Sequence, residues 1–237
     1  MTLFLGTSGY AYAEWKGVFY PAELKTKDQL RYFASRFGSV EINYTFRRHP
    51  SETTLDAWRE QTPDGFLFTL KAHQNITHRR RLKEAESDVA FFLERAKRLG
   101  DRLGVILFQC PPNLAFDRDR LNVFLDTLPE GGRYAMEFRH PSWEDARDVL
   151  RERGVAWCTA ETDEQAAPTD SWEPFAYLRL RKEIYPDEQL AAWAGRVRGA
   201  LESGHDVFCY FKHEEKGIGP IYAERMAGLL GTSAAVG

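Results

Sequence analysis

Short apolar runs alternate with longer amphipathic segments along almost the whole chain, and no other feature limits the fold as strongly. The runs have the length and the aromatic and β-branched content of buried strands, whereas the segments between them repeat apolar residues at helical spacing. The runs that predict strands are 3–8, 39–43, 66–71, 104–109, 134–139, 155–160, 176–181 and 206–211. The segments that predict helices are 27–37, 51–61, 84–99, 117–127, 143–153, 187–203 and 219–230.

Eight such units within 237 residues predict a single α/β domain, 1–237, with the TIM-type (β/α)8 barrel fold. A doubly wound open sheet is the alternative for the same pattern. The connection between the sixth and seventh runs, 161–174, contains two prolines and is too short for a helix with its loops. We therefore expect an irregular segment to replace the helix between strands 6 and 7. The side chains expected to cap helix N-termini are Ser51, Asp117, Ser142 and Asp187.

Composition and charge favour a soluble, cytoplasmic protein. The net charge is only −3, so nothing global indicates a nucleic acid or a membrane surface as partner. The start, MTLFLGTSGY, lacks the regions of a signal peptide, and no apolar stretch approaches the roughly 20 residues that span a bilayer. The three cysteines lack CxxC spacing, which favours buried reduced thiols over a disulfide or a zinc site. The sequence carries no signal for the oligomeric state.

Polar and charged side chains recur at alternate positions near the carboxyl ends of the predicted strands. Residues two apart on a strand share a face, so the two members of each pair point the same way. The pairs are Glu41 with Asn43, Thr69 with Lys71, Glu137 with Arg139, and Arg179 with Arg181, and Gln109 ends the fourth strand. We expect this set to face the barrel axis at its C-terminal mouth, where barrels of this class place their active sites.

The charges of this set do not balance. The carboxylates are Glu41 and Glu137, and the cations are Lys71, Arg139, Arg179 and Arg181, which leaves two positive charges in excess. A small phosphorylated or carboxylated anion would restore the balance, since arginine binds such groups through a bidentate fork. The alternative is a structural ion-pair network that fills the barrel.

The same residue types suit acid–base chemistry, as in a hydrolase or an isomerase. We expect Glu41 or Glu137 to be the general base and Lys71 or His140 the acid or electrostatic stabiliser, because neighbouring charges push pKa values apart. No cofactor is predicted. The residues expected to contact the anion are Asn43, His78, Gln109, Arg139, Arg179, Arg181 and Trp143.

Two loop segments keep a nucleic-acid function as an alternative. ITHRRRLK (76–83) follows the third strand and RHPSW (139–143) follows the fifth, so both lie at the predicted mouth. Consecutive arginines suit a phosphate backbone, although a solvated loop has the same composition. A non-catalytic interaction protein is the third class of function.

A metal site is the weaker interpretation of the histidines. His73, His140 and His213 follow predicted strands, and Glu41 and Glu137 could join them as ligands. No HxH or HExxH spacing is present, and the nearby lysine and arginines oppose a cation. The sequence therefore predicts no metal ligands, with a divalent ion as the alternative.

An ordered series of motifs resembles the YecE-like family, domain of unknown function 72. The motifs are GTSGY, W-K-G-x-F-Y-P, VEIN-x-TF, TP-x-x-F-x-F-x-x-K, ITH, Q-x-PP and E-x-RHPSW, and they extend over nearly the whole chain. The resemblance implies a TIM-type barrel and assigns no activity. It implies as motif residues Glu41, Asn43, Thr45, Phe46, Lys71, His78, Gln109, Glu137, Arg139, His140 and Trp143. The chain departs from the family pattern at Arg47, Arg181, Lys182 and the segment YFKHEEKG.

Overall fold

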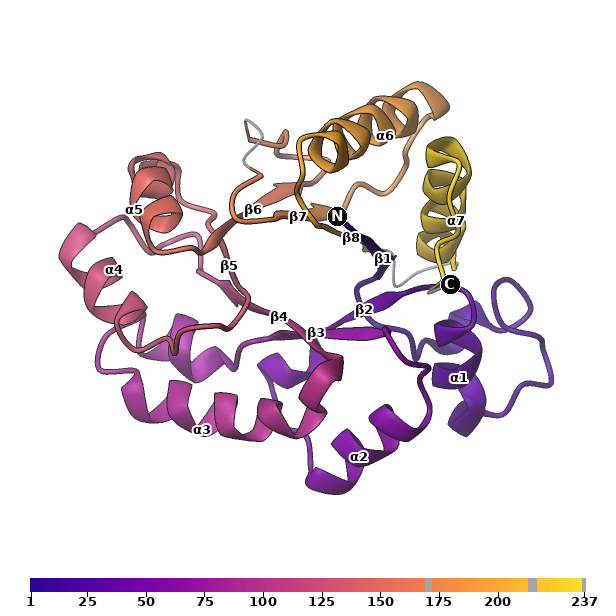
Figure 1. Cartoon of the computed structure of the whole chain (residues 1–237), viewed down its shortest axis with the longest axis horizontal. Helices are drawn as coiled ribbons and strands as arrows, with labels where there is room; N and C mark the ends of the chain where they lie inside the picture. Colours follow the sequence, from indigo (N-terminus) through magenta and orange to yellow (C-terminus); the bar gives the residue numbers. More distant parts are fainter. Residues whose placement is uncertain (169–171, 213–216, 236–237) are drawn as a thin grey trace.

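The computed structural model describes residues 1–168, 172–212 and 217–235. Eight parallel strands form a ring with the helices outside it, in the sheet order β1-β8-β7-β6-β5-β4-β3-β2 (Figure 1). The strands are β1 (Leu3–Thr7), β2 (Ser39–Ile42), β3 (Leu67–Lys71), β4 (Leu103–Gln109), β5 (Tyr134–Glu137), β6 (Ala156–Glu161), β7 (Ala176–Leu180) and β8 (Val207–Phe211). The predicted (β/α)8 barrel is therefore confirmed, and the open doubly wound sheet is not formed.

The ring closes where β1 and β2 meet. Ser8 and Glu41 form a parallel bridge there, and the Gly9 N–H donates to the Glu41 carbonyl at 2.7 Å. A Cβ at Gly6 would lie 1.9 Å from the Ser39 carbonyl oxygen, so glycine is required for this approach. Closure fixes the end of β1 beside the end of β2, and both ends belong to the mouth.

The helices follow the predicted segments with small shifts of their ends. The α-helices are α1 (Gln29–Ala34), α2 (Glu52–Glu60), α3 (Glu86–Ala96), α4 (Arg118–Leu125), α5 (Arg147–Glu152), α6 (Asp187–Glu202) and α7 (Ile218–Leu230). Short helical turns add η1 (Ala13–Trp15), η2 (Thr26–Asp28), η3 (Tyr44–Phe46), η4 (Asn75–Arg79), η5 (Lys97–Arg102) and η6 (Pro141–Ala146). The described residues between β6 and β7 contain no helix, as the two prolines of this connection predict.

Two of the four predicted N-caps are confirmed. Ser51 Oγ accepts from the Thr54 N–H at 3.1 Å, and Asp117 Oδ1 accepts from the Arg120 N–H at 3.0 Å. The prediction for Ser142 is wrong, because a 3₁₀ turn begins earlier, at Pro141, and the side chain of His140 caps it. Asp187 is the first residue of α6 rather than its cap.

The barrel interior is apolar at its N-terminal end and polar at its C-terminal end. The apolar part contains Leu67, Val105, Leu107, Ala135, Ala156, Phe175, Tyr177 and Phe208. Above it, Tyr210 OH lies 2.7 Å from both Ser39 Oγ and Thr69 Oγ1, so these buried hydroxyls satisfy one another. The interior is thus a packed core that supports the charged residues at the mouth.

Two further expectations come from composition. Cys110, Cys158 and Cys209 are buried and unpaired, in agreement with reduced thiols. Within the described ranges, no helix combines the length and the apolar character that a membrane crossing requires.

Candidate functional site

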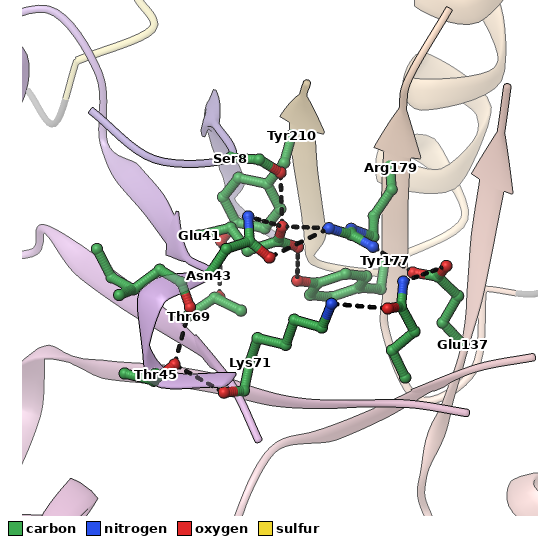
Figure 2. Close-up of polar contacts among 12 residues, drawn as sticks. Ser8, Glu41, Asn43, Thr45, Thr69, Lys71, Glu137, Tyr177, Arg179 and Tyr210 are labelled. Atoms are coloured by element: carbon green, nitrogen blue, oxygen red, sulfur yellow. Dashed lines mark hydrogen bonds and ion pairs between the residues drawn. The ribbon is translucent and has the colours of Figure 1, made fainter. Parts of the chain in front are cut away.

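Arg179 lies between the two carboxylates of the mouth (Figure 2). Its NH2 group donates to Glu41 Oε1 at 2.7 Å, and its NH1 group donates to Glu137 Oε2. The three residues come from β2, β5 and β7, and the whole residues are 0%, 2% and 1% exposed for Glu41, Glu137 and Arg179. Buried ions persist only when they are paired and hydrogen-bonded, and this triad meets that requirement.

Further donors complete the shell of Glu41. Ser8 Oγ donates to Oε1 at 2.5 Å, and Tyr177 OH donates to Oε2 at 2.6 Å. The amide of Asn43 donates to Oε1 at 3.2 Å, and its oxygen accepts from Arg179 at 3.4 Å. Glu41 is thus held from β1, β2 and β7 together.

The triad fixes the ionisation of its members. Burial alone raises the pKa of a carboxyl, but Arg179 and the hydrogen bonds to Glu41 outweigh burial and hold its pKa below the ordinary value. The pKa of Glu137 is also lowered, because Arg179, Arg139 and Arg181 together outweigh its burial. Burial lowers the pKa of an arginine, yet the two carboxylates raise that of Arg179 well above its usual range.

A glutamine joins Glu137 to the lysine of β3. Gln109 Nε2 donates to Glu137 Oε1 at 2.6 Å, and Gln109 Oε1 accepts from Lys71 Nζ at 2.6 Å. The strand register places Gln109 directly beside Glu137, which makes the first of these contacts. Lys71 Nζ also lies 4.2 Å from the centroid of the Phe46 ring.

The pKa of Lys71 is lowered towards neutral pH. Burial lowers its pKa to about 8, and the charge of Arg179 acts in the same direction. Glu137 and Glu41 raise the pKa, but by less than burial lowers it. The amine therefore exchanges a proton more readily near neutral pH than an ordinary lysine does.

Two arginines stand at the rim of the triad. Arg139 Nε donates to Glu137 Oε1 at 3.2 Å, and its side chain is 39% exposed. Arg181 is half-buried, and its Nε has no hydrogen-bond partner among the described residues. Burial lowers the pKa of Arg181, as does the charge of Arg179. Four cations thus surround two carboxylates, and the predicted excess of two positive charges is present in one place.

The comparisons with known proteins agree with this fold. Residues 4–236 match the family described as protein of unknown function DUF72. The chain belongs to the DUF72 family. It is 35% identical over 134 residues to the UPF0759 protein YecE of Escherichia coli K12, an alignment that covers 53% of this chain and 49% of that protein. The UPF0759 protein YunF of Bacillus subtilis is 30% identical over 139 residues, with 52% and 47% covered. The chain thus matches about half the length of these curated relatives.

Solved structures of the DUF72 family have the same architecture. A DUF72 family protein of Thermotoga maritima superposes with a TM-score of 0.86 at 25% identity and covers 98% of this chain and 100% of that one. A DUF72 family protein of Enterococcus faecalis has a TM-score of 0.80 at 16% identity, with 98% and 96% covered. The second likeness is one of fold alone.

Two predicted residues of this DUF72 chain, His78 and His140, lie at the rim. The His78 ring packs edge-on to Phe46 at 4.8 Å between centroids, and its Nδ1 lies 2.9 Å from Thr77 Oγ1. Burial lowers the pKa of His78, and the charges of Lys71 and Arg139 lower it further. His140 accepts from the Ser142 N–H at 3.3 Å and therefore has a structural contact of its own.

A small cavity of about 110 Å³ lies beside the mouth, between β5 and β6. The register of these strands pairs Ala135 with Ala156 and Met136 with Trp157 and extends no further, so the strands diverge above these pairs. The polar residues that line the cavity are Glu137, Arg139, His140, Glu144, Thr162 and Gln165. His140 is therefore placed beside Arg139, although it does not reach the triad.

Three residues predicted as ligand contacts are buried: Gln109, described above, and Trp143 and Arg179. Trp143 is 1% exposed, stacks on Phe138 at 4.1 Å and donates its indole N–H to the Leu114 carbonyl at 2.6 Å. Arg179 is equally buried, and both carboxylates occupy its terminal nitrogens. Neither side chain has a surface that a ligand could contact, so the accessible cations are Lys71, Arg139 and Arg181.

The arginine run of this DUF72 chain forms contacts within the protein. Arg80 pairs with Asp88 at 2.5 Å, and Arg81 donates to the Asn113 carbonyl at 2.6 Å. Arg79 and Lys83 are exposed. Two of the four basic residues proposed for a nucleic-acid backbone are thus engaged elsewhere, and that function stays a prediction.

The metal alternative gains no cluster of ligands. In the described part of the chain, no group of three His, Cys, Asp or Glu side chains is placed to hold an ion. His73 stacks on His49 at 4.4 Å, with its Nε2 3.3 Å from the Arg47 carbonyl. His213 lies outside the described residues.

Sequence reasoning missed two residues of the site, Ser8 and Tyr177. Tyr177 lies two residues before Arg179, so the alternation that selected Arg179 also places Tyr177 on the inner face. It reads as an ordinary aromatic strand residue, and nothing in the sequence marks its hydroxyl as a partner of Glu41. Ser8 becomes a partner through the closure of β1 on β2, which is a long-range contact.

Proposed function

We propose that this protein binds a small anionic ligand, phosphorylated or carboxylated, at the C-terminal mouth of the barrel. One observation carries the proposal: four cations surround two carboxylates, Arg179 pairs with both carboxylates, Arg139 pairs with Glu137, and neither Lys71 nor Arg181 has an ion pair among the described residues. Lys71, Arg139 and Arg181 then retain charge that no described acidic residue neutralises fully. An anion would neutralise that charge and would accept hydrogen bonds from groups that lack them, which is how arginine sites recognise phosphate and carboxylate.

The geometry favours Lys71 as the group that exchanges a proton with the bound ligand. A general acid or base works best when its pKa lies near the working pH, and the pKa of Lys71 is about 8. Glu41 and Glu137 are less suited to the role of general base that their residue type suggests, because Arg179 holds their pKa values low. We assign these carboxylates a positioning role: both hold Arg179, and Glu137 also orients Lys71 through Gln109.

Calorimetric titration of the full chain with sulfate, inorganic phosphate and acetate at low ionic strength tests the binding proposal. We expect saturable binding of at least one of these anions. Arg181→Met and Lys71→Met should each weaken that binding by about tenfold, which corresponds to about 1.4 kcal/mol. Arg151→Met is the control for net charge, because Arg151 is an exposed residue of α5 paired with Asp148.

Two outcomes would contradict the proposal. Absence of binding for all three anions would leave the charges as structural pairs. Binding that Arg151→Met weakens as much as Arg181→Met does would indicate a nonspecific effect of net charge, because such an effect depends on the sum of charges and not on their position.

A further inference from the structure

A cleft with aromatic walls opens beside the cationic mouth, between the segments that follow β1 and β2. Its volume is about 270 Å³. The side chains that form most of its wall are Tyr10, Tyr12, Ile42, Asn43, Tyr44 and Trp58. Four of these six are aromatic rings, which offer flat apolar faces to a planar group.

The walls of the cleft are held by contacts of their own. Tyr12 OH donates to the Ser8 carbonyl at 2.7 Å, and its ring lies where any side chain at residue 9 would extend. Gly9 has a φ of +88°, so glycine satisfies both the backbone and the ring. Trp58 stacks on Phe68 at 5.3 Å and lies edge-on to Tyr44 at 6.2 Å. The cleft is thus present before any ligand binds.

Asn43 connects this cleft to the charged groups. Its side chain lines the cleft, and its amide contacts both Glu41 and Arg179 at 3.2 and 3.4 Å. The turn η3 that follows presents Tyr44 to the cleft and Phe46 to Lys71. One short segment, 43–46, therefore forms a wall of the apolar cleft and a support of the cationic group.

We infer that the ligand is an anion carried on a planar ring, with the ring in the aromatic cleft and the phosphate or carboxylate at Lys71 and Arg181. This inference rests on the proposed function and adds the class of ligand to it. Tyr44 is 40% exposed, so its ring is available for stacking. A bare anion would use the cations alone and leave the cleft empty.

The test compares methyl phosphate with phenyl phosphate by calorimetric titration of the full chain. We expect phenyl phosphate to bind at least tenfold more tightly. Tyr44→Ala should remove most of this difference and leave the affinity for methyl phosphate unchanged, whereas Tyr44→Phe should retain the difference because it retains the ring. Phe91→Ala is the control, because Phe91 is an exposed aromatic residue of α3 outside the cleft.

The outcomes distinguish failure of this inference from failure of the proposed anion binding. Equal affinity for the two phosphates, or a preference that Tyr44→Ala does not reduce, overturns the inference and leaves anion binding intact. No binding of either phosphate overturns both.

Discussion

The charged residues at the barrel mouth form two groups that differ in how far their charges are satisfied. Glu41, Glu137 and Arg179 are buried, and each carboxylate has an ion pair and further hydrogen-bond donors. Lys71 and Arg181 lie next to them, half-buried, with no carboxylate paired to either in the described residues. Under the proposed function, the first group holds the strands in place and the second group retains charge for a ligand. Burial and pairing, rather than residue type, therefore separate the satisfied charges of this mouth from the unsatisfied ones.

The largest expected effect comes from removal of the cation that the first group shares. Arg179→Met leaves two buried carboxylates without their ion pair, and loss of one partner of a buried pair typically costs about 3–5 kcal/mol. We expect the free energy of unfolding at pH 7, measured by urea denaturation, to fall by about that amount. Equal stability of variant and wild type would show that the triad does not hold the strands together.

The pH dependence of the same variant identifies the cause of the loss. In the wild type the pKa values of both carboxyl groups lie below the ordinary value of 4.5. Deprotonation of Glu41 and Glu137 is therefore more favourable in the folded protein than in the unfolded chain. Their stabilisation is present above pH 4.5 and is lost as pH falls towards the folded-state pKa values. In Arg179→Met that dependence should disappear or reverse, because buried carboxylates without a cation prefer the protonated form.

A smaller effect is expected at the hydroxyl that supports Glu41. Tyr177→Phe removes the bond from Tyr177 OH to Glu41 Oε2 and leaves the ring in place. Hydrogen bonds to charged groups contribute about 1.5–3 kcal/mol, so we expect a loss of stability in that range in urea denaturation. Tyr134→Phe is the control, because it removes a tyrosine hydroxyl that donates to an uncharged acceptor, the Pro129 carbonyl. The loss of stability in Tyr134→Phe should be smaller than in Tyr177→Phe.

The contrast between the two groups also explains what the sequence predicts. Alternation along the strands predicts the barrel and the inward direction of Glu41, Lys71, Glu137 and Arg179, because strand geometry has a strict period of two. Which cation pairs with which carboxylate depends on registers and on closure between β1 and β2, and these contacts join residues far apart in the chain. The sequence therefore predicts the sum of the charges, and the structure is needed to identify the cations that remain available.

Trp143 and Arg179 illustrate this limit most directly. Arg179 lies near the end of β7 and Trp143 lies in the turn η6 after β5, where a residue can face either a ligand or the core. Trp143 enters the core because η6 begins at Pro141 and turns the indole against Phe138 and Leu114. Arg179 is buried because two strands bring carboxylates to its terminal nitrogens. Neither packing partner is adjacent in sequence, so local pattern does not identify the outcome.

A further prediction concerns Arg181, a cation without a paired carboxylate among the described residues. Burial of an unpaired cation is unfavourable, so Arg181→Met should change the free energy of unfolding by less than about 1 kcal/mol, in the stabilising direction. Urea denaturation in ligand-free buffer measures the change, beside Arg179→Met as the reference. A loss comparable with that of Arg179→Met would place Arg181 in the structural group and would remove the distinction between the two groups.

The most specific expected effect is the dependence of anion binding on the protonation of Lys71. The free protein has a Lys71 pKa of about 8, and a bound anion favours the charged amine, so binding takes up a proton above that pH. Affinity for sulfate, whose own charge is constant in this range, should be highest below pH 8 and fall by at most about tenfold per pH unit above it. The contribution of Lys71 to ligand-free stability should change in the opposite direction: the unfolded chain keeps the ordinary pKa of 10.5 and binds more protons at this amine between pH 8 and 10.5, so this contribution rises with pH there.

Calorimetric titration with sulfate and urea denaturation across pH 7–10 measure these two opposite slopes on one protein. Buried cysteines and tyrosines with raised pKa values add the same pH dependence of stability to every variant, so the stability slope of Lys71 is measured as wild type minus Lys71→Met at each pH. Lys71→Met should abolish the slope in affinity, and this difference defines the slope in stability, whereas Lys97→Met, at an exposed lysine paired with Glu94, should leave both as in the wild type. Slopes of the same sign, or an affinity slope that persists in Lys71→Met, would assign the titration to another group. Opposite slopes that both depend on Lys71 would show that one amine is unfavourable in the folded protein and favourable to the ligand, which is the property that distinguishes the second group from the first.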